Sequence, residues 1–100
     1  MNIQIQFVQI PRSETFETFI QKKLSLLAEK YDWLIKAQVN IKQENDPSPK
    51  GKICEIELSA PGPRIFSSSN EESFELAVTE TIQDLERQLK KRKSKMKPHL

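Results

Sequence analysis

Residues 37–60 read AQVNIKQENDPSPKGKICEIELSA, and this stretch decides the fold. Apolar and polar side chains alternate in two parts of it, first over 37–42 and then over 54–60. A period of two is typical of strands that bury one face and expose the other. The connector at 45–51 is rich in turn-forming residues, so the two strands are expected to pair as an antiparallel hairpin.

The segments before this hairpin predict a strand followed by a helix. Residues 3–7 alternate in the same way, and Pro11 ends that pattern. Apolar residues at steps of three and four over 16–34 then predict an amphipathic helix of about five turns. Ser13 is placed to cap its N-terminus, because a serine oxygen can accept from the first free backbone amides.

The segments after the hairpin predict a short strand over 64–68 and a second helix over about 70–96. The buried face of the strand stays undecided, because Ile65 and Phe66 are adjacent. Ser69 and Glu72 have the spacing of a capping box, and an apolar stripe runs from residue 74 to residue 89. Pro98 is expected to mark the end of this helix.

The predicted class is α+β, with the order β-α-β-β-β-α. A strand-helix-strand connection is nearly always right-handed and parallel, and short turns make the later strands antiparallel, which gives a four-stranded mixed sheet. Each well-defined strand has a polar face, so both helices should cover the other face in a two-layer sandwich similar to double-stranded RNA-binding domains. One hundred residues (1–100) suffice for a single domain.

Composition argues against several classes of function. The one histidine, His99, is near the end of the sequence, and the one cysteine, Cys54, lies on a buried strand face. With only two glycines, Gly51 and Gly62, there is no Gly-rich phosphate loop. We therefore expect no catalytic residue, metal site, cofactor or small-molecule substrate. No apolar run is long enough for a membrane span, and the N-terminus is no signal peptide, so a cytoplasmic protein is expected.

Charge is distributed very unevenly along the chain. Seven of the eleven residues over 87–97 are basic, whereas residues 1–86 hold nine basic and fourteen acidic residues, a balance of −5. Such a dense cationic end indicates a polyanionic partner, most often nucleic acid. Favourable contact with the helix dipole explains two or three cations near a helix C-terminus, but seven repel one another.

The predicted binding residues follow from helical spacing. A helix over 70–96 is about 40 Å long, longer than strands of about 20 to 26 Å, so its last two turns are expected to protrude into solvent. On the first helix, Lys23 and Lys30 share one flank and Lys22 lies on the other. Because both helices cover one sheet face, these lysines are expected to line the groove between the helices and to extend the positive surface. The candidates are Lys22, Lys23, Lys30, Arg87, Lys90, Lys91, Lys93, Lys95 and Lys97. Only Trp33 among the aromatic residues is free to stack on a base, which favours backbone contacts to structured RNA.

The complete pattern resembles a known family. Ser13, the pair Tyr31-Asp32 and the run DLERQLKKRKSKMK at 84–97 are similar to the ribosome hibernation-promoting factor family, also called ribosome-associated inhibitor or sigma-54 modulation protein. The resemblance implies a bacterial stress or stationary-phase factor. It would bind 16S rRNA in the decoding channel of the small ribosomal subunit, block mRNA and tRNA, and so inhibit translation.

The resemblance also implies which residues bind. Basic positions of the family match Lys23, Arg87, Lys91, Lys93, Lys95 and Lys97. Leu26 falls where the family has a second lysine, and Glu75 where it has an aromatic residue, so the first helix is expected to contribute less. A chain that ends at residue 100 matches the short form, without the C-terminal dimerisation domain, and the isolated protein is expected to be monomeric.

Two other functions remain open from the sequence. The chain also fits a module that binds tRNA or double-stranded RNA, which competition between ribosomal subunits and duplex RNA would separate from ribosome binding. It further fits a protein-interaction module whose acidic body binds a sigma factor. In that case, reversing the charge of the basic tail would leave partner binding unchanged.

Overall fold

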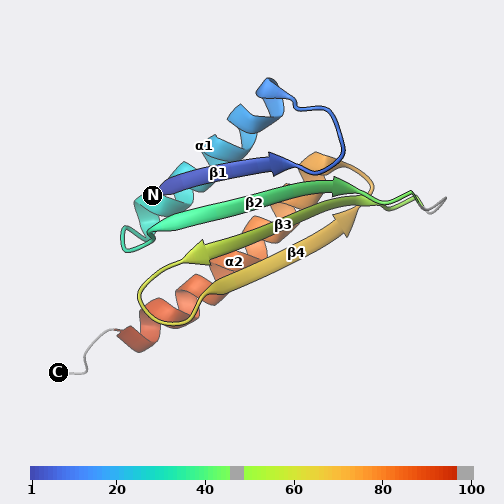
Figure 1. The fold of residues 1–100 in the computed structure, drawn as a ribbon. Helices are drawn as coiled ribbons and strands as arrows, with labels where there is room; N and C mark the ends of the chain where they lie inside the picture. The colour runs from blue at the N-terminus through green and yellow to red at the C-terminus, as the bar shows by residue number, and fades with distance from the viewer. Residues whose placement is uncertain (46–48, 97–100) are drawn as a thin grey trace.

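A computed structural model describes residues 1–45 and 49–96. Its elements follow the predicted β-α-β-β-β-α order (Figure 1). They are β1 (Asn2–Phe7), α1 (Glu14–Lys30), β2 (Lys36–Gln43), β3 (Lys52–Ser59), β4 (Ile65–Glu71) and α2 (Phe74–Met96).

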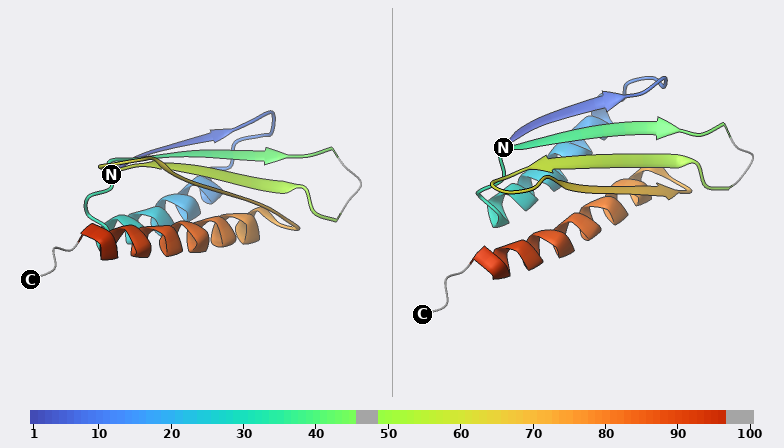
Figure 2. Two further views of the ribbon diagram at one scale, coloured as in Figure 1. Left: turned by 90° about the horizontal axis from the view of Figure 1, so that it is seen from below. Right: turned by 60° about the horizontal axis from the view of Figure 1, so that its bottom comes forward.

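The four strands form one mixed sheet in the order β1-β2-β3-β4. β1 runs parallel to β2, while β2, β3 and β4 are antiparallel to their neighbours. One row of the register joins Ile5, Val39, Ile56 and Ser67, so the alternating positions of all four strands point to the same face. Both helices cover that face and leave the other open (Figure 2). The predicted two-layer α+β fold is confirmed.

The core lies between the sheet and the two helical stripes. Its largest fully buried apolar side chains on the helices are Ile20, Leu24, Val78, Leu85 and Leu89. Thr81 is also buried, and its hydroxyl donates to the carbonyls of Ala77 at 2.7 Å and Cys54 at 3.3 Å. Burial raises the pKa of the Cys54 thiol to about 12. Cys54 is therefore a small core residue, because a reactive cysteine needs a lowered pKa.

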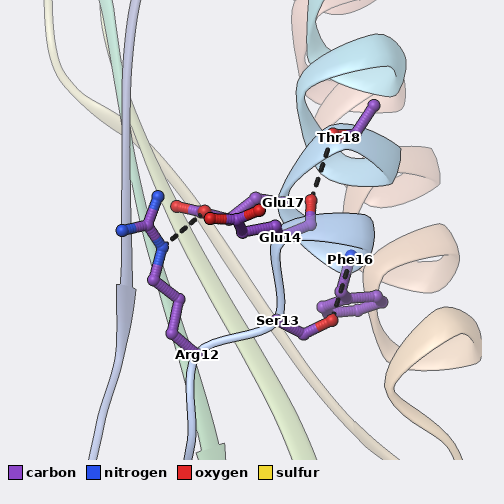
Figure 3. Close-up of polar contacts among 6 residues, drawn as sticks. All are labelled: Arg12, Ser13, Glu14, Phe16, Glu17 and Thr18. Atoms are coloured by element: carbon purple, nitrogen blue, oxygen red, sulfur yellow. Dashed lines mark hydrogen bonds and ion pairs between the residues drawn. The ribbon is translucent and has the colours of Figure 1, made fainter.

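The start of α1 is held by polar side chains that the sequence places in its first turn (Figure 3). The Ser13 hydroxyl accepts from the Phe16 amide at 3.2 Å, as expected of an N-cap. Arg12 donates to Glu17 at 2.7 Å, and this hydrogen bond raises the pKa of the guanidinium. The helix is shorter than the predicted stripe, because it ends at Lys30 and Leu34 is buried from the connector that follows.

The start of α2 differs from the prediction. β4 continues to Glu71, where it still pairs with Lys52, so the backbone of Ser69 belongs to the sheet and cannot cap a helix. Ser73 is the cap instead, and its hydroxyl accepts from the Leu76 amide at 3.1 Å. The capping box at Ser69 was therefore wrong, and α2 begins four residues later than expected.

The facing of β4 is settled by its pairing with β3. Ile65 pairs with Leu58 and is 2% exposed, whereas Phe66 pairs with Glu57 and is 54% exposed. The open face of the sheet thus carries an aromatic side chain. The expectation that Trp33 alone was free to stack is wrong, since Trp33 packs partly buried against the core and meets the ring of Tyr31 edge-on at 5.9 Å.

Candidate nucleic-acid interface

The basic residues of α2 gather at one end of the molecule, which we call the cationic pole and define by Arg87, Lys90, Lys91, Lys93 and Lys95. The C-terminal ends of α1 and α2 both lie there, beside the turn between β3 and β4 (Figures 1 and 2). Each helix C-terminus carries a partial negative charge, which favours some of these cations. All five side chains are exposed, so the pole is open to solvent.

One row of the pole consists of Arg87, Lys91 and Lys95 and lies on the side of α2 next to β4. Lys91 and Lys95 line a shallow groove together with Ile65, Gln88 and Arg92. The amide of Gln88 donates to the Phe66 carbonyl at 3.0 Å and to Asp84 at 2.9 Å, which ties this side of α2 to the edge strand. Hydrogen bonds to the Asp84 carboxyl lower its pKa, with the larger effect from Ser67 and the next largest from Gln88.

Arg87 begins this row and is the one member with a carboxylate partner among the described residues. Its guanidinium lies 3.4 Å from Asp84, one turn earlier in α2, and its side chain is 70% exposed. Exposed pairs of this kind contribute little and are screened by salt. Arg87 thus remains able to contact an anion.

The second row lies on the flank of α2 that faces α1. Lys93 places its ammonium 5.6 Å from the centre of the Tyr31 ring, directly after the end of α1. Lys90 is exposed on the same side, as helical spacing predicts. Lys97 and the adjoining Pro98 and His99 lie outside the described residues.

Arg92 was expected to project into solvent with the last turns of α2, but it is bonded to the turn between β3 and β4. Its guanidinium donates to the carbonyls of Pro61 at 3.5 Å and Pro63 at 2.5 Å, in the turn between β3 and β4. Gly62 shapes this turn with a φ of 96°, a conformation that favours glycine. Arg92 is therefore a structural clamp, and Lys91 and Lys95 beside it remain exposed.

The predicted overhang of α2 is partly covered by the turn between β3 and β4. Arg92 donates to the Pro63 carbonyl in that turn, and among the described residues Lys93–Met96 extend past this contact, about one turn. Figure 2 shows α2 ending close to the β3–β4 turn rather than far beyond it. The late start of α2 and the reach of the turn at 60–64 both shorten the overhang. The cations thus form a surface on the body rather than a free rod.

The lysines of α1 divide between two surfaces. Lys23 and Lys30 line a groove of about 240 Å³ between the helices, which we call the inter-helix groove. Its other lining residues are Leu26, Leu27, Thr79, Ile82, Gln83 and Glu86. Lys30 donates to Glu86 at 2.9 Å, and this hydrogen bond raises the lysine pKa. Lys22 lies on the outer side of α1, in a separate groove with Gln21 and Ser25.

Little of this positive charge is compensated within the part of the chain that the structure describes. Of the eight candidate cations there, only Lys30 and Arg87 lie within 4 Å of a carboxylate. The ammonium of Lys23 lies 5.2 Å from the centre of the Phe19 ring instead. Since neighbouring like charges repel without a counter-charge, the arrangement suits an external polyanion.

Within residues 1–45 and 49–96, no group of three or more histidine, cysteine, aspartate or glutamate side chains is placed to hold a metal ion. No helix in those ranges is long and apolar enough to cross a membrane.

Comparison with known proteins gives one family and a shared fold. A family model described as "Sigma 54 modulation protein / S30EA ribosomal protein" matches residues 3–97. A ribosomal subunit interface protein from Coxiella burnetii has a similar structure, with a TM-score of 0.84, 22% identity, and coverage of 94% of this chain and 99% of that one. The Protein Y N-terminal domain from Thermus thermophilus is also similar, with a TM-score of 0.78, 22% identity, and coverage of 91% and 98%. No curated protein matches significantly.

Proposed function

The chain belongs to the Sigma 54 modulation protein / S30EA ribosomal protein family, and we propose on this basis that it is a ribosome hibernation factor. It binds 16S rRNA in the decoding channel of the small ribosomal subunit. There it occupies the space that mRNA and tRNA need, and so inhibits translation under stress or in stationary phase. The chain acts as one ribosome-binding domain, as a monomer, in the cytoplasm.

The observation that carries this proposal is the open, largely uncompensated cationic pole. Lys90, Lys91, Lys93 and Lys95 are all exposed, and none has a carboxylate within 4 Å among the described residues. Lysine and arginine side chains that contact phosphates release condensed counterions, which supplies much of the affinity for nucleic acid. The pole thus provides binding energy, and the rigid body behind it provides the steric block.

The charge of the body supports an oriented mode of binding. Residues 1–86 have a net charge of about −5 by the count above, so this part of the molecule is repelled by RNA while the pole is attracted. The protein therefore enters an rRNA-lined channel with the pole first. Inhibition of this kind is reversible and needs no bond to be made or broken.

The structural relatives support the ribosome as the partner. The Coxiella burnetii protein is described as a ribosomal subunit interface protein, and its chain is covered almost completely by the match. A position at the subunit interface is consistent with a factor that blocks the decoding channel. We therefore favour ribosomal RNA over free duplex RNA or a sigma factor as the target.

Sedimentation with purified small subunits tests the proposal. The test variant replaces Arg87, Lys91 and Lys95 with glutamine. The control variant replaces Arg12, Lys36 and Arg64, which lie outside the pole, with glutamine as well. Both lose three positive charges. The wild type and the control should pellet with the subunits, whereas the test variant should remain in the supernatant with an unchanged circular dichroism spectrum.

Two results would overturn the proposal. If the test variant pellets as well as the wild type, the pole does not bind the subunit. If a free RNA duplex or tRNA competes as effectively as added subunits, the protein is a general RNA-binding module.

A further inference from the structure

The inter-helix groove combines three chemical features within one small site. The apolar part of its lining, which we call the floor, consists of Leu26, Leu27 and Ile82, and Leu26 is 61% exposed. Lys23 and Lys30 occupy the α1 rim. The α2 wall presents hydrogen-bonding groups without positive charge, which are the hydroxyl of Thr79, the amide of Gln83 and the carboxylate of Glu86.

These features suit a nucleobase better than a phosphate. A phosphate would gain nothing from the apolar floor and would be repelled by Glu86 on the α2 wall. A base buries its ring faces against apolar side chains and presents donors and acceptors at its edge, which amide and carboxylate side chains recognise. The volume of about 240 Å³ lies below that of pockets for drug-sized ligands, so the groove has room for one ring system rather than for a larger molecule.

The two lysines are spaced to hold the backbone on either side of such a base. Lys23 and Lys30 are seven residues apart, which is about 10 Å along a helix. Different phosphates of one strand can therefore contact them while the base between enters the groove. Lys30 already bonds Glu86 at 2.9 Å across the groove, so this pair forms a boundary at one end.

The groove also leads to the cationic pole. Glu86, Lys90 and Lys93 follow one another along the α1-facing flank of α2, at steps of four and three residues. RNA that contacts Lys90 and Lys93 thus passes the end of the groove. We propose that the inter-helix groove accepts one unpaired RNA base, which carries an exocyclic amino group that donates to the side-chain oxygen of Gln83. This inference rests on the proposed function, since it names a contact within the same RNA complex.

Chemical footprinting of unpaired bases in small subunits tests the inference. Leu26→Gln and Gln83→Ala change the floor and the wall without changing the charge. Leu76→Gln is the matched control, because Leu76 is 42% exposed and lies outside the groove. Each groove variant should restore the reactivity of the same base while other protections remain. Affinity should fall about tenfold, as expected for the loss of one base contact, with an unchanged dependence on salt.

The possible failures are distinguishable. If wild-type protein protects no bases and does not bind subunits, the proposed function falls and this inference falls with it. If the wild type binds but its protections are the same in Leu26→Gln and Gln83→Ala, only the inference about the groove is overturned. A photo-crosslinker at position 26 that captures a ribosomal protein instead of RNA would likewise overturn it.

Discussion

Arg92 and Lys91 are adjacent cations to which the structure assigns opposite roles, and replacing each with glutamine separates the two roles. Arg92→Gln removes hydrogen bonds to the carbonyls of Pro61 and Pro63. Bonds from charged donors contribute more than neutral ones, but Arg92 is only half-buried, so we expect a loss of about 1 kcal/mol. For a chain of this size, that corresponds to a fall in Tm of about 4–8 °C. Lys91→Gln should change stability by less than about 0.5 kcal/mol.

The dependence of binding on salt should show the reverse order. Removing one phosphate contact lowers the slope of log K against log salt by about 0.7 to 0.9. Lys91→Gln should show that change, whereas Arg92→Gln should keep the wild-type slope even where its affinity falls. Arg92→Lys should lose stability as the glutamine variant does, because an ammonium cannot reproduce the planar fork of a guanidinium.

Thermal unfolding and subunit binding at several salt concentrations measure both quantities on the same variants. The reasoning fails if Arg92→Gln lowers the salt slope while Tm stays unchanged. In that case Arg92 would be a phosphate ligand and the contact with the turn would be incidental.

Three further expectations concern the core and the link between the helices. The Cys54 thiol has a pKa of about 12 in the folded protein and an ordinary value of 9.0, so the unfolded chain loses this proton at a lower pH. The free energy of unfolding should therefore fall above pH 9, by up to about 1.4 kcal/mol per pH unit. Urea titrations at pH 8 and pH 10 should show that Cys54→Ala loses less stability between these two pH values than the wild type does. Leu89→Ala should cost about 2–5 kcal/mol in urea unfolding, because Leu89 is fully buried where α2 packs on the sheet. Glu86→Gln should free Lys30 for RNA, with the pKa of Lys30 returning toward its ordinary value in NMR titrations and a modest rise in affinity for subunits; unchanged affinity would show that Lys30 does not contact RNA.

Much of the fold could be predicted because each element buries only one side. Alternation over 37–42 and 54–60 is read directly from the chain, since β2 and β3 place every second residue against the helices. The same holds for the stripes of α1 and α2, and for Ser13, whose capping bond is local. The placement of Lys23 and Lys30 in a groove followed from both helices lying on one face.

The remaining features depend on contacts between distant segments. Ser69 has the local pattern of a cap, but pairing with Cys54 keeps it in the sheet. The face to which Phe66 points is set by its pairing with Glu57. The sequence does not show this face, because the serines that follow Phe66 give no alternation of apolar residues. Arg92 looks like any other cation of the tail until the turn at 60–64 is seen beside it. Local patterns could not distinguish these cases.

The salt dependence of binding to purified small subunits measures most directly whether the cationic pole binds phosphates. The five cations of the pole, together with Lys23, correspond to about six neutralised phosphates, so the slope of log K against log salt should be about −4 to −5. Replacing Arg87, Lys91 and Lys95 with glutamine should bring that slope about two to three closer to zero. A wild-type slope near zero would contradict the account, because binding would then owe nothing to the positive charge on which it is based.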